Sequence, residues 1–337
     1  MDIGIDLGTA NIVMTTARKG VVLNEASVVA YNRKRRCVMA VGNSAEKMTG
    51  RSPKYINLIR PVENGVISDD NMTKVIIREF IMRIMGNQLV RPRVIVCIPS
   101  SITDVESRAV KDAVMGAGSR KVFLIQEPVA AMIGAGKDIS KPYGNLVIDI
   151  GGGTTDIAVI ALNGIVKSAS VKTAGNKLDN SIMRYILNRY KVLIGMKTAE
   201  HIKIHLANVS SPDSKRTMLI GGKNIANGLP EQLRISELDA YYAVRDDMND
   251  ILSAVISVLE KTPPELSSDI YKNGALLTGG GALLKGIDTL IYKELGIKCH
   301  IADDAITCAA KGTSRAFRII DNLLDGFEYI NASEYIM

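Results

Sequence analysis

Tryptophan is absent from this 337-residue chain, and only 4% of its residues are aromatic. Proteins that bind single-stranded nucleic acid stack the bases on aromatic side chains, so the sequence predicts no nucleic-acid partner despite a formal net charge of +7. Long apolar runs are also missing, because none approaches the roughly 18 residues of a membrane-spanning helix. A secretory signal is not expected either, since a strand pattern begins at Asp2.

Cysteine is scarce and scattered. Cys37, Cys97, Cys299 and Cys308 form no C-x-x-C pair, and none has a histidine partner at the spacing of metal ligands. This distribution is typical of buried thiols in a reducing cytosol rather than of a metal site, so we expect a cytoplasmic protein. The length exceeds what one simple core accommodates and predicts two or more lobes.

The basic residues are spread along the chain with one cluster, Arg33-Lys34-Arg35-Arg36. This cluster stands between two short apolar segments, so a solvated hairpin turn is favoured over a binding patch. For the excess positive charge as a whole, an anionic membrane surface is a better candidate partner than nucleic acid.

One motif occurs twice in the sequence. Ile3–Asn11 and Leu146–Asp156 each begin with a run of aliphatic residues, then reach Asp, Gly and small or hydroxyl residues. A second apolar run follows each of them, at Ile12–Met14 and Ile157–Ile160. Each motif therefore predicts a strand, a glycine turn and a returning strand.

The two predicted hairpins suggest a shared ligand. Glycine turns let backbone N–H groups approach phosphate oxygens, and Asp6 or Asp149 can hold a metal directly or through water. One such hairpin says little about function, and either Asp could simply cap its own turn. Two hairpins with Asp at matching positions predict a duplicated fold whose turns clamp one polyphosphate.

Strand and helix patterns alternate in both halves of the chain. Capping motifs at Thr103–Glu106 and Ser236–Asp239 open two of the expected helices. Other helices are expected over residues 128–136, 180–193 and 307–321, and from Ala282 onward. The first and third of these ranges are expected to connect the lobes.

Six segments resemble the MreB family of bacterial actins, within the superfamily of actin, sugar kinases and heat-shock ATPases. They occur in the family's order across nearly the whole chain. The resemblance implies an α/β actin-like ATPase fold, with duplicated ribonuclease-H-like lobes and a nucleotide cleft between them. The six segments are Gly4–Asn11, Arg60–Ile67, Phe123–Ala131, Asp149–Thr155, Glu260–Leu266 and Leu277–Leu284.

The resemblance also implies a domain division. Lobe I is expected to comprise residues 1–140 together with a C-terminal helix at about 305–337, and a small subdomain at about 30–66 is inserted in it. Lobe II is expected to comprise 141–304, with a small subdomain at about 180–240 inserted.

By the same resemblance the cleft binds ATP or ADP with Mg²⁺. Asp6 and Asp149 match the Mg²⁺-side carboxylates, acting through ordered water. Glu127 matches the residue that polarises the attacking water, and Thr154 helps to place that water. An interlobe salt bridge is the alternative role for Glu127. The two phosphate loops are Gly8, Thr9, Ala10 and Asn11, and Gly151, Gly152, Gly153 and Thr154.

Further residues resemble the nucleoside pocket. Glu200 and Lys203 are three apart on one predicted helix and can face a ribose together. An exposed helical ion pair is the alternative for these two, and a helix cap is the alternative for Asp179. The full set is Gly175, Asp179, Glu200, His201, Ile202, Lys203, Gly280, Gly281, Ala282 and Leu283.

Filaments and a membrane surface follow from the resemblance. It implies self-assembly into paired, antiparallel protofilaments at the inner face of the cell membrane, with wall-synthesis and membrane-anchor proteins as partners. No N-terminal amphipathic helix is expected, because the first strand begins at Asp2. Leu89 and Val90, flanked by Arg91 and Arg93, match the family's apolar membrane loop, although an ordinary lead-in to a strand is equally compatible.

Two other classes compete with a polymerising ATPase. A small-molecule kinase of the superfamily needs a catalytic Asp for its acceptor hydroxyl, and a chaperone ATPase is expected to carry a peptide-binding domain after the nucleotide domain. The chain departs from the family pattern at Gln126, where many relatives have a second Glu, at Ile12, and at Asp156, where Glu is frequent. Gln126 could alter the hydrolysis rate or the coupling between lobes.

Overall fold

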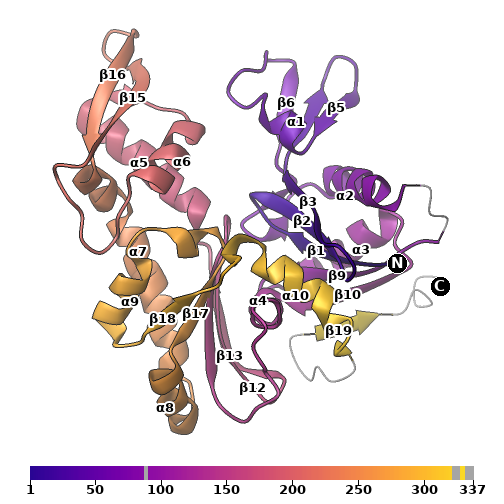
Figure 1. Cartoon of the computed structure of the whole chain (residues 1–337). Coiled ribbons are helices and arrows are strands. Elements are labelled where there is room, and N and C mark those ends of the chain that lie inside the picture. Colours follow the sequence, from indigo (N-terminus) through magenta and orange to yellow (C-terminus); the bar gives the residue numbers. More distant parts are fainter. Residues whose placement is uncertain (87–89, 321–326, 331–337) are drawn as a thin grey trace.

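Two β-sheets with helices between and around them organise the computed structural model, which describes residues 1–86, 90–320 and 327–330 (Figure 1). One sheet has the strand order β19-β10-β9-β1-β2-β3 and the other β13-β12-β11-β17-β18. The strands of these sheets are β1 (Asp2–Leu7), β2 (Asn11–Thr16), β3 (Gly20–Ala26), β9 (Arg93–Ile98), β10 (Lys121–Gln126), β11 (Asn145–Ile150), β12 (Thr155–Ala161), β13 (Gly164–Val171), β17 (Ala275–Thr278), β18 (Cys299–Ile301) and β19 (Phe327–Ile330).

The two sheets repeat one topology. In the first, β1 pairs with β2 antiparallel and with β9 parallel. In the second, β11 pairs with β12 antiparallel and with β17 parallel. The duplication predicted from the two hairpin motifs is therefore present in the strand order, and both hairpins have the predicted strand–turn–strand form.

Smaller sheets extend from each large one. In Figure 1 the segment with β5, β6 and α1 projects above the first sheet, and β15 and β16 project above the second. The small sheets are β5-β4-β6, β14-β15-β16 and β7-β8. Their strands are β4 (Val29–Asn32), β5 (Cys37–Val41), β6 (Ile56–Ile59), β7 (Val62–Glu63), β8 (Val66–Ile67), β14 (Val192–Leu193), β15 (Thr217–Asn224) and β16 (Pro230–Ser236).

Two of the helices begin at the capping boxes that the sequence predicts. Thr103 and Ser236 each form a complete capping box, with Glu106 and Asp239 as the N3 partners, as predicted. The helices are α1 (Asn43–Glu46), α2 (Asp70–Met85), α3 (Asp104–Gly116), α4 (Glu127–Gly134), α5 (Gly175–Tyr190), α6 (Met196–His205), α7 (Glu237–Glu260), α8 (Pro264–Asn273), α9 (Ile287–Leu295) and α10 (Cys308–Ala316), with 3₁₀ turns η1 (Gly280–Leu283) and η2 (Ala305–Thr307).

Three helix predictions were wrong in their bounds. The helix expected from Ala282 is only the 3₁₀ turn η1, and α9 begins at Ile287, after Gly286 in a left-handed conformation. The helix expected over 180–193 begins at Gly175 and ends at Tyr190, where Lys191 adopts φ 58°. The helix expected over 307–321 ends at Ala316, and residue 321 lies outside the described part of the chain.

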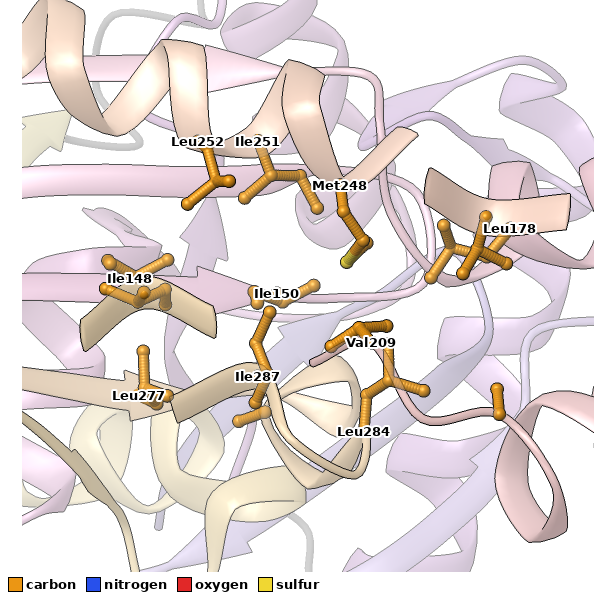
Figure 2. Close-up of a cluster of buried hydrophobic side chains, with 14 of the residues drawn as sticks. Ile148, Ile150, Leu178, Val209, Met248, Ile251, Leu252, Leu277, Leu284 and Ile287 are labelled. Atoms are coloured by element: carbon orange, nitrogen blue, oxygen red, sulfur yellow. The ribbon is translucent and has the colours of Figure 1, made fainter. Parts of the chain in front are cut away.

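The second sheet has its own core. Figure 2 shows Met248, Ile251 and Leu252 of α7 facing Ile148 and Ile150 of β11. All five side chains are buried, and fully burying an aliphatic side chain of this size contributes about 1.5–3 kcal/mol. This packing holds the end of β11 in place, directly before the second glycine turn.

Helices α4 and α10 cross between the two sheets at unusually close range (Figure 1). A Cβ on Gly312 would overlap the carbonyl oxygen of Ala130, and one on Gly134 would overlap that of Cys308. Arg315 Nη1 donates to the Gly134 carbonyl at 2.5 Å, and the Cys308 thiol donates to that of Ala131 at 3.2 Å. Glycine is therefore required here for close backbone approach.

This crossing joins both halves of the molecule. On one side, Thr15 Oγ1 of β2 donates to the Ala310 carbonyl of α10 at 2.8 Å. On the other, Val147 of β11 and Ala158 of β12 share a buried cluster with α4 and with Ala309 of α10. The two sheets are thus connected through one tightly packed helix pair.

We expect Gly312→Ala to lower the free energy of unfolding by about 1–3 kcal/mol, because the added methyl group must push two backbones apart. Chemical denaturation midpoints measure this. Gly221→Ala is the matched control, since a Cβ there meets open space, and a change within about 0.5 kcal/mol is expected for it. Equal midpoints for the two variants would contradict the tight crossing.

Candidate functional site

A cavity of about 360 Å³ is lined by residues from both halves of the chain. The two hairpin turns, the start of α4, the start of α5, α6, and the 3₁₀ turns η1 and η2 all contribute to it. The predicted site residues among its lining are Asp6, Gly8, Thr9, Ala10, Asn11, Glu127, Asp149, Gly151, Gly152, Gly153, Thr154, Gly175, Glu200, Lys203, Gly280, Gly281 and Leu283.

Four predicted pocket residues do not line the cavity. Ile202 and Ala282 are fully buried in the hydrophobic core beside it. His201 is exposed on α6, with its ring 4.2 Å from that of His205. Asp179 is buried and forms an ion pair with Lys203 at 2.9 Å. Asp179 therefore positions the lysine that does line the cavity.

The two glycine turns both line the cavity, and they pack closely against each other. A Cβ on Gly152 would meet the Ala10 side chain at 2.8 Å, and one on Gly153 would overlap the Thr9 hydroxyl. Only turns without side chains at these positions can approach so closely. The space that they leave suits a group bound by backbone N–H donors, such as a phosphate chain.

Gly65 is a lining residue that the sequence analysis did not assign. Its backbone N–H donates to Thr9 Oγ1 at 3.0 Å, so the β7–β8 turn is attached to the first glycine turn. A Cβ on Gly65 would also meet Thr154 Cγ2 at 2.9 Å. The sequence signal that could have identified Gly65 is the Arg60–Ile67 segment, one of the six segments that resemble the MreB family.

Asp6 and Asp149 occupy equivalent positions in the two sheets. Asp6, on β1, pairs with Val13 of β2 and Cys97 of β9. Asp149, on β11, pairs with Asp156 of β12 and Thr278 of β17. Both carboxylates stand where a central strand ends and its glycine turn begins, and both line the cavity.

These carboxylates destabilise one another when ionised. Burial raises the pKa of Asp6 to about 7. Burial, followed by the nearby charges of Asp6 and Asp156, raises the pKa of Asp149 to about 8. A divalent cation between the two would relieve this repulsion.

Glu127 is the first residue of α4, directly before Pro128. Burial, then the charges of Asp156, Asp149 and Asp6, raise its pKa well above the usual range. Its side chain lies beside that of Asp156, and among the described residues no Lys, Arg or His forms an ion pair with it. The alternative of an interlobe salt bridge therefore has no cationic partner in this part of the structure.

Asp156 is a second residue that the sequence analysis treated only as a departure from the family pattern. It is fully buried, and its Oδ1 accepts a 2.6 Å hydrogen bond from the Ser100 backbone N–H. Burial raises its pKa, opposed by this bond and by neighbouring hydroxyls. The loop after β9 thus fixes Asp156 in place next to Glu127.

The donor set fits Mg²⁺ held largely through water. No group of three or more His, Cys, Asp or Glu side chains within the described residues is arranged to hold a metal ion. Two carboxylates beside a phosphate-sized cavity are typical of Mg²⁺, which keeps several waters and takes its remaining ligands from phosphate.

Part of the cavity lining is apolar. Ile204, Leu283 and Ile306 line it with 64%, 56% and 48% of their surfaces exposed. Large exposed aliphatic side chains around a pocket suit a flat ring system. Ile204 and Ile306 were not predicted, because isolated aliphatic residues carry no recognisable sequence signal.

The predicted membrane residue that the structure describes, Val90, does not line the cavity. Val90 is 65% exposed and lies three residues before the start of β9, whereas Leu89 lies outside the described residues. Across those residues, no helix is long and apolar enough to cross a bilayer.

The raised pKa values predict a pH dependence. The folded state favours the protonated form of Asp149, so stability from this group is present near pH 4 and is lost as the pH rises through about 8. Without nucleotide and with a chelator, Asp149→Asn should gain stability relative to wild type by up to about 1.4 kcal/mol per pH unit over that range. Urea denaturation at several pH values measures the difference, and the exposed Asp303→Asn is the control. A pH-independent difference for Asp149→Asn would contradict the raised pKa of Asp149.

Comparison with known proteins gives a consistent family. The sequence model described as MreB/Mbl protein matches residues 1–325. The cell shape-determining protein MreB of Escherichia coli K12 is 44% identical over 326 residues, covering 95% of this chain and 94% of the relative. The cell shape-determining protein Mbl of Bacillus subtilis 168 is 45% identical over 323 residues, covering 96% and 97%.

Solved structures agree on the fold. MreB5 of Spiroplasma citri bound to ADP superposes with a TM-score of 0.90 at 36% identity, covering 95% of this chain and 96% of that one. The chain of the MamK double helical filament has a TM-score of 0.81 at 20% identity, covering 94% and 98%, which shows the fold alone. The α/β actin-like fold expected from the sequence is confirmed, and the chain belongs to the MreB/Mbl family.

Proposed function

We propose that this chain is a cell-shape-determining cytoskeletal protein that binds ATP with Mg²⁺ and assembles into filaments. The main observation in support of this proposal is the cavity lined by two matching glycine turns, with Asp6 and Asp149 at equivalent strand ends. MreB5 of Spiroplasma citri binds ADP and AMPPNP in structures with TM-scores of 0.90 and 0.88. The Escherichia coli and Bacillus subtilis relatives are both named as cell shape-determining.

In this proposal the phosphates lie between Gly8–Asn11 and Gly151–Thr154, and the base lies against Leu283 and Ile306. Lys203, held by Asp179, faces the nucleotide together with Glu200, one turn apart on α6. Mg²⁺ supplies charge neutralisation beside Asp6 and Asp149. These residues bind and orient ATP, and the burial of the site keeps bulk water away from the phosphates.

Glu127 and Thr154 are the proposed catalytic residues. Phosphoryl transfer depends mainly on positioning and charge neutralisation, so the attacking water must be held in line. The Glu127 carboxyl can accept a hydrogen bond from that water, and the neighbouring carboxylates raise its pKa and so favour its protonated form until a cation is bound. Thr154 lines the same cavity and supplies a hydroxyl on the second turn. Slow hydrolysis coupled to assembly is expected from the resemblance to the MreB family.

We also propose the domain division implied by the resemblance. Lobe I comprises residues 1–140 with the C-terminal segment from about 305, and lobe II comprises 141–304. Small subdomains at about 30–66 and 180–240 stand on either side of the cleft. Separate hydrophobic clusters around the two large sheets support this division.

Association with the inner face of the membrane and with wall-synthesis proteins completes the proposal. The MamK filament supports filament formation through its shared fold, and antiparallel pairing of protofilaments is the proposed arrangement. Val90, exposed and flanked by arginines, is the proposed membrane-contacting residue of the 89–90 loop.

Replacing Glu127 should separate binding from hydrolysis. We expect Glu127→Gln to lower the ATP turnover number by about 10²–10⁴-fold, the usual contribution of a positioned acid–base group, while ATP affinity changes little. Phosphate release and binding of a fluorescent ATP analogue measure the two quantities. The exposed Glu265→Gln is the control and should retain wild-type turnover. Unchanged turnover in Glu127→Gln would remove this residue from the mechanism.

Assembly tests the proposed function as a whole. We expect filaments and sedimentable protein with ATP-Mg²⁺, and little of either without nucleotide, because the ligand joins both lobes across the cleft. Electron microscopy and sedimentation measure this. The alternative is a small-molecule kinase of the same superfamily. Steady ATP turnover without polymer in any nucleotide state, together with phosphorylation of an acceptor in a substrate screen, would establish that alternative instead.

A further inference from the structure

Positive charge is concentrated in one small part of the molecule. Residues 29–62 hold eight Lys and Arg side chains and one carboxylate, Glu46. The surplus of seven positive charges equals the formal net charge of +7 of the whole chain. The rest of the chain therefore has equal numbers of basic and acidic residues. The segment forms the small sheet β5-β4-β6 with α1, which projects from the rest of the structure at the top of Figure 1. We call it the basic tip.

The β4–β5 turn of the basic tip is ordered by specific contacts. The buried Asn32 side chain accepts hydrogen bonds from the backbone N–H groups of Lys34 and Arg35, both at 3.0 Å. The Arg33 N–H donates to the Tyr55 carbonyl at 2.9 Å, and the Lys34 ammonium lies 5.1 Å from the Tyr55 ring centroid. The turn and the 51–55 segment therefore form one surface.

The cations of this surface lack partners of opposite charge. In the described part of the chain, the one carboxylate of the tip, Glu46, is occupied by Arg60 at 2.8 Å and by Lys197 at 3.4 Å. Seven side chains remain exposed and without an ion pair there. They are Arg33, Lys34, Arg35, Arg36, Lys47, Arg51 and Lys54. Like charges so close together raise the energy of the free protein, and a polyanion relieves that repulsion.

A second copy of this chain is a poor partner for the basic tip. Five of the six carboxylates of the acidic helix α7 already form ion pairs. Glu237 contacts Arg216 and Lys285, at 3.0 and 3.1 Å, and the Asp250 carboxylate contacts Lys177 at 2.8 Å. Breaking these local pairs would be required to form new ones between molecules.

Nucleic acid also fits less well than lipid. The tip surface contains one exposed aromatic ring, Tyr55, whose face is covered by Lys34, so no platform for base stacking is available. Clusters of four to eight Lys and Arg are typical of surfaces that bind anionic lipid headgroups. The exposed Met39 on β5 adds an apolar side chain to the same small sheet.

We propose that the basic tip docks onto an anionic lipid surface, as a membrane contact separate from the 89–90 loop. The inference rests on the proposed function only in taking a membrane as a partner of the protein. Arg33–Arg36 form the exposed hairpin turn that the sequence favoured, and the proposal adds a ligand for that turn. The contact is electrostatic and multivalent, with phosphate groups of the headgroups as its ligands.

The test compares two variants of equal net charge. In the first, Arg33, Lys34 and Arg35 are replaced by Ser, and Arg36 by Asn, because Arg36 has a φ of 52° that Asn tolerates. In the second, the exposed Lys261, Lys272, Lys293 and Lys298 are replaced by Ser. Co-sedimentation with phosphatidylcholine vesicles, with and without phosphatidylglycerol, measures binding. Val90→Asp is tested in parallel, and thermal unfolding and ATP affinity verify that each variant is folded.

Each basic side chain near an anionic surface is expected to increase the affinity about fivefold. The tip variant, which lacks four of them, should therefore bind phosphatidylglycerol vesicles at least about tenfold more weakly than wild type. The second variant should bind within about twofold of wild type. Wild-type binding should be lost near 1 M salt, where the Debye length falls to about 3 Å.

The outcomes separate this inference from the proposed function. Equal losses in the two charge variants, or a loss only in Val90→Asp, would overturn the basic tip as a site while leaving membrane association intact. Wild-type protein that forms filaments but ignores both kinds of vesicle would overturn the membrane part of the proposed function together with the tip. A tip variant that keeps vesicle binding but loses duplex DNA binding in a gel-shift assay would make nucleic acid the ligand.

Discussion

The close crossing of α4 and α10 is the constraint on which the rest of the structure depends. Gly134 and Gly312 allow the two helix backbones to touch, and no larger residue fits at either position. Glu127 begins α4, and Ala309 of α10 lines the cavity, so the same contact that joins the two sheets also positions the site. A movement of one sheet relative to the other must pass through this helix pair, which couples the shape of the cavity to the arrangement of the lobes.

The site itself is electrostatically unfavourable without a ligand. Asp6, Asp149, Asp156 and Glu127 all have raised pKa values, with burial as the first cause in each case. The packing of α7 against β11 and the helix crossing supply the stability that this arrangement costs. A divalent cation bound beside these carboxylates would reduce their repulsion and so stabilise the folded state.

The surface charges of the basic tip differ from those of the rest of the chain. Most of the chain is balanced through local pairs such as Glu237 with Arg216, whereas the basic tip keeps seven cations exposed. The Lys197 ammonium of α6 reaches the Glu46 carbonyl oxygen at 2.7 Å, so the tip is in contact with the helix that carries Glu200 and Lys203. A membrane contact at the tip and nucleotide at the cavity would thus act on neighbouring elements.

The sequence by itself determined the elements that depend on local chemistry. Its two hairpin motifs specified the strand–turn–strand units, the matching positions of Asp6 and Asp149, and the capping boxes at Thr103 and Ser236, because these require only neighbouring residues. Only the tertiary structure decided that Asp179 holds Lys203, that Asp156 contacts Glu127, that Gly65 reaches Thr9, and that Ile202 belongs to the core. These contacts join segments far apart along the chain, and their geometry depends on how the two sheets pack around the α4–α10 crossing.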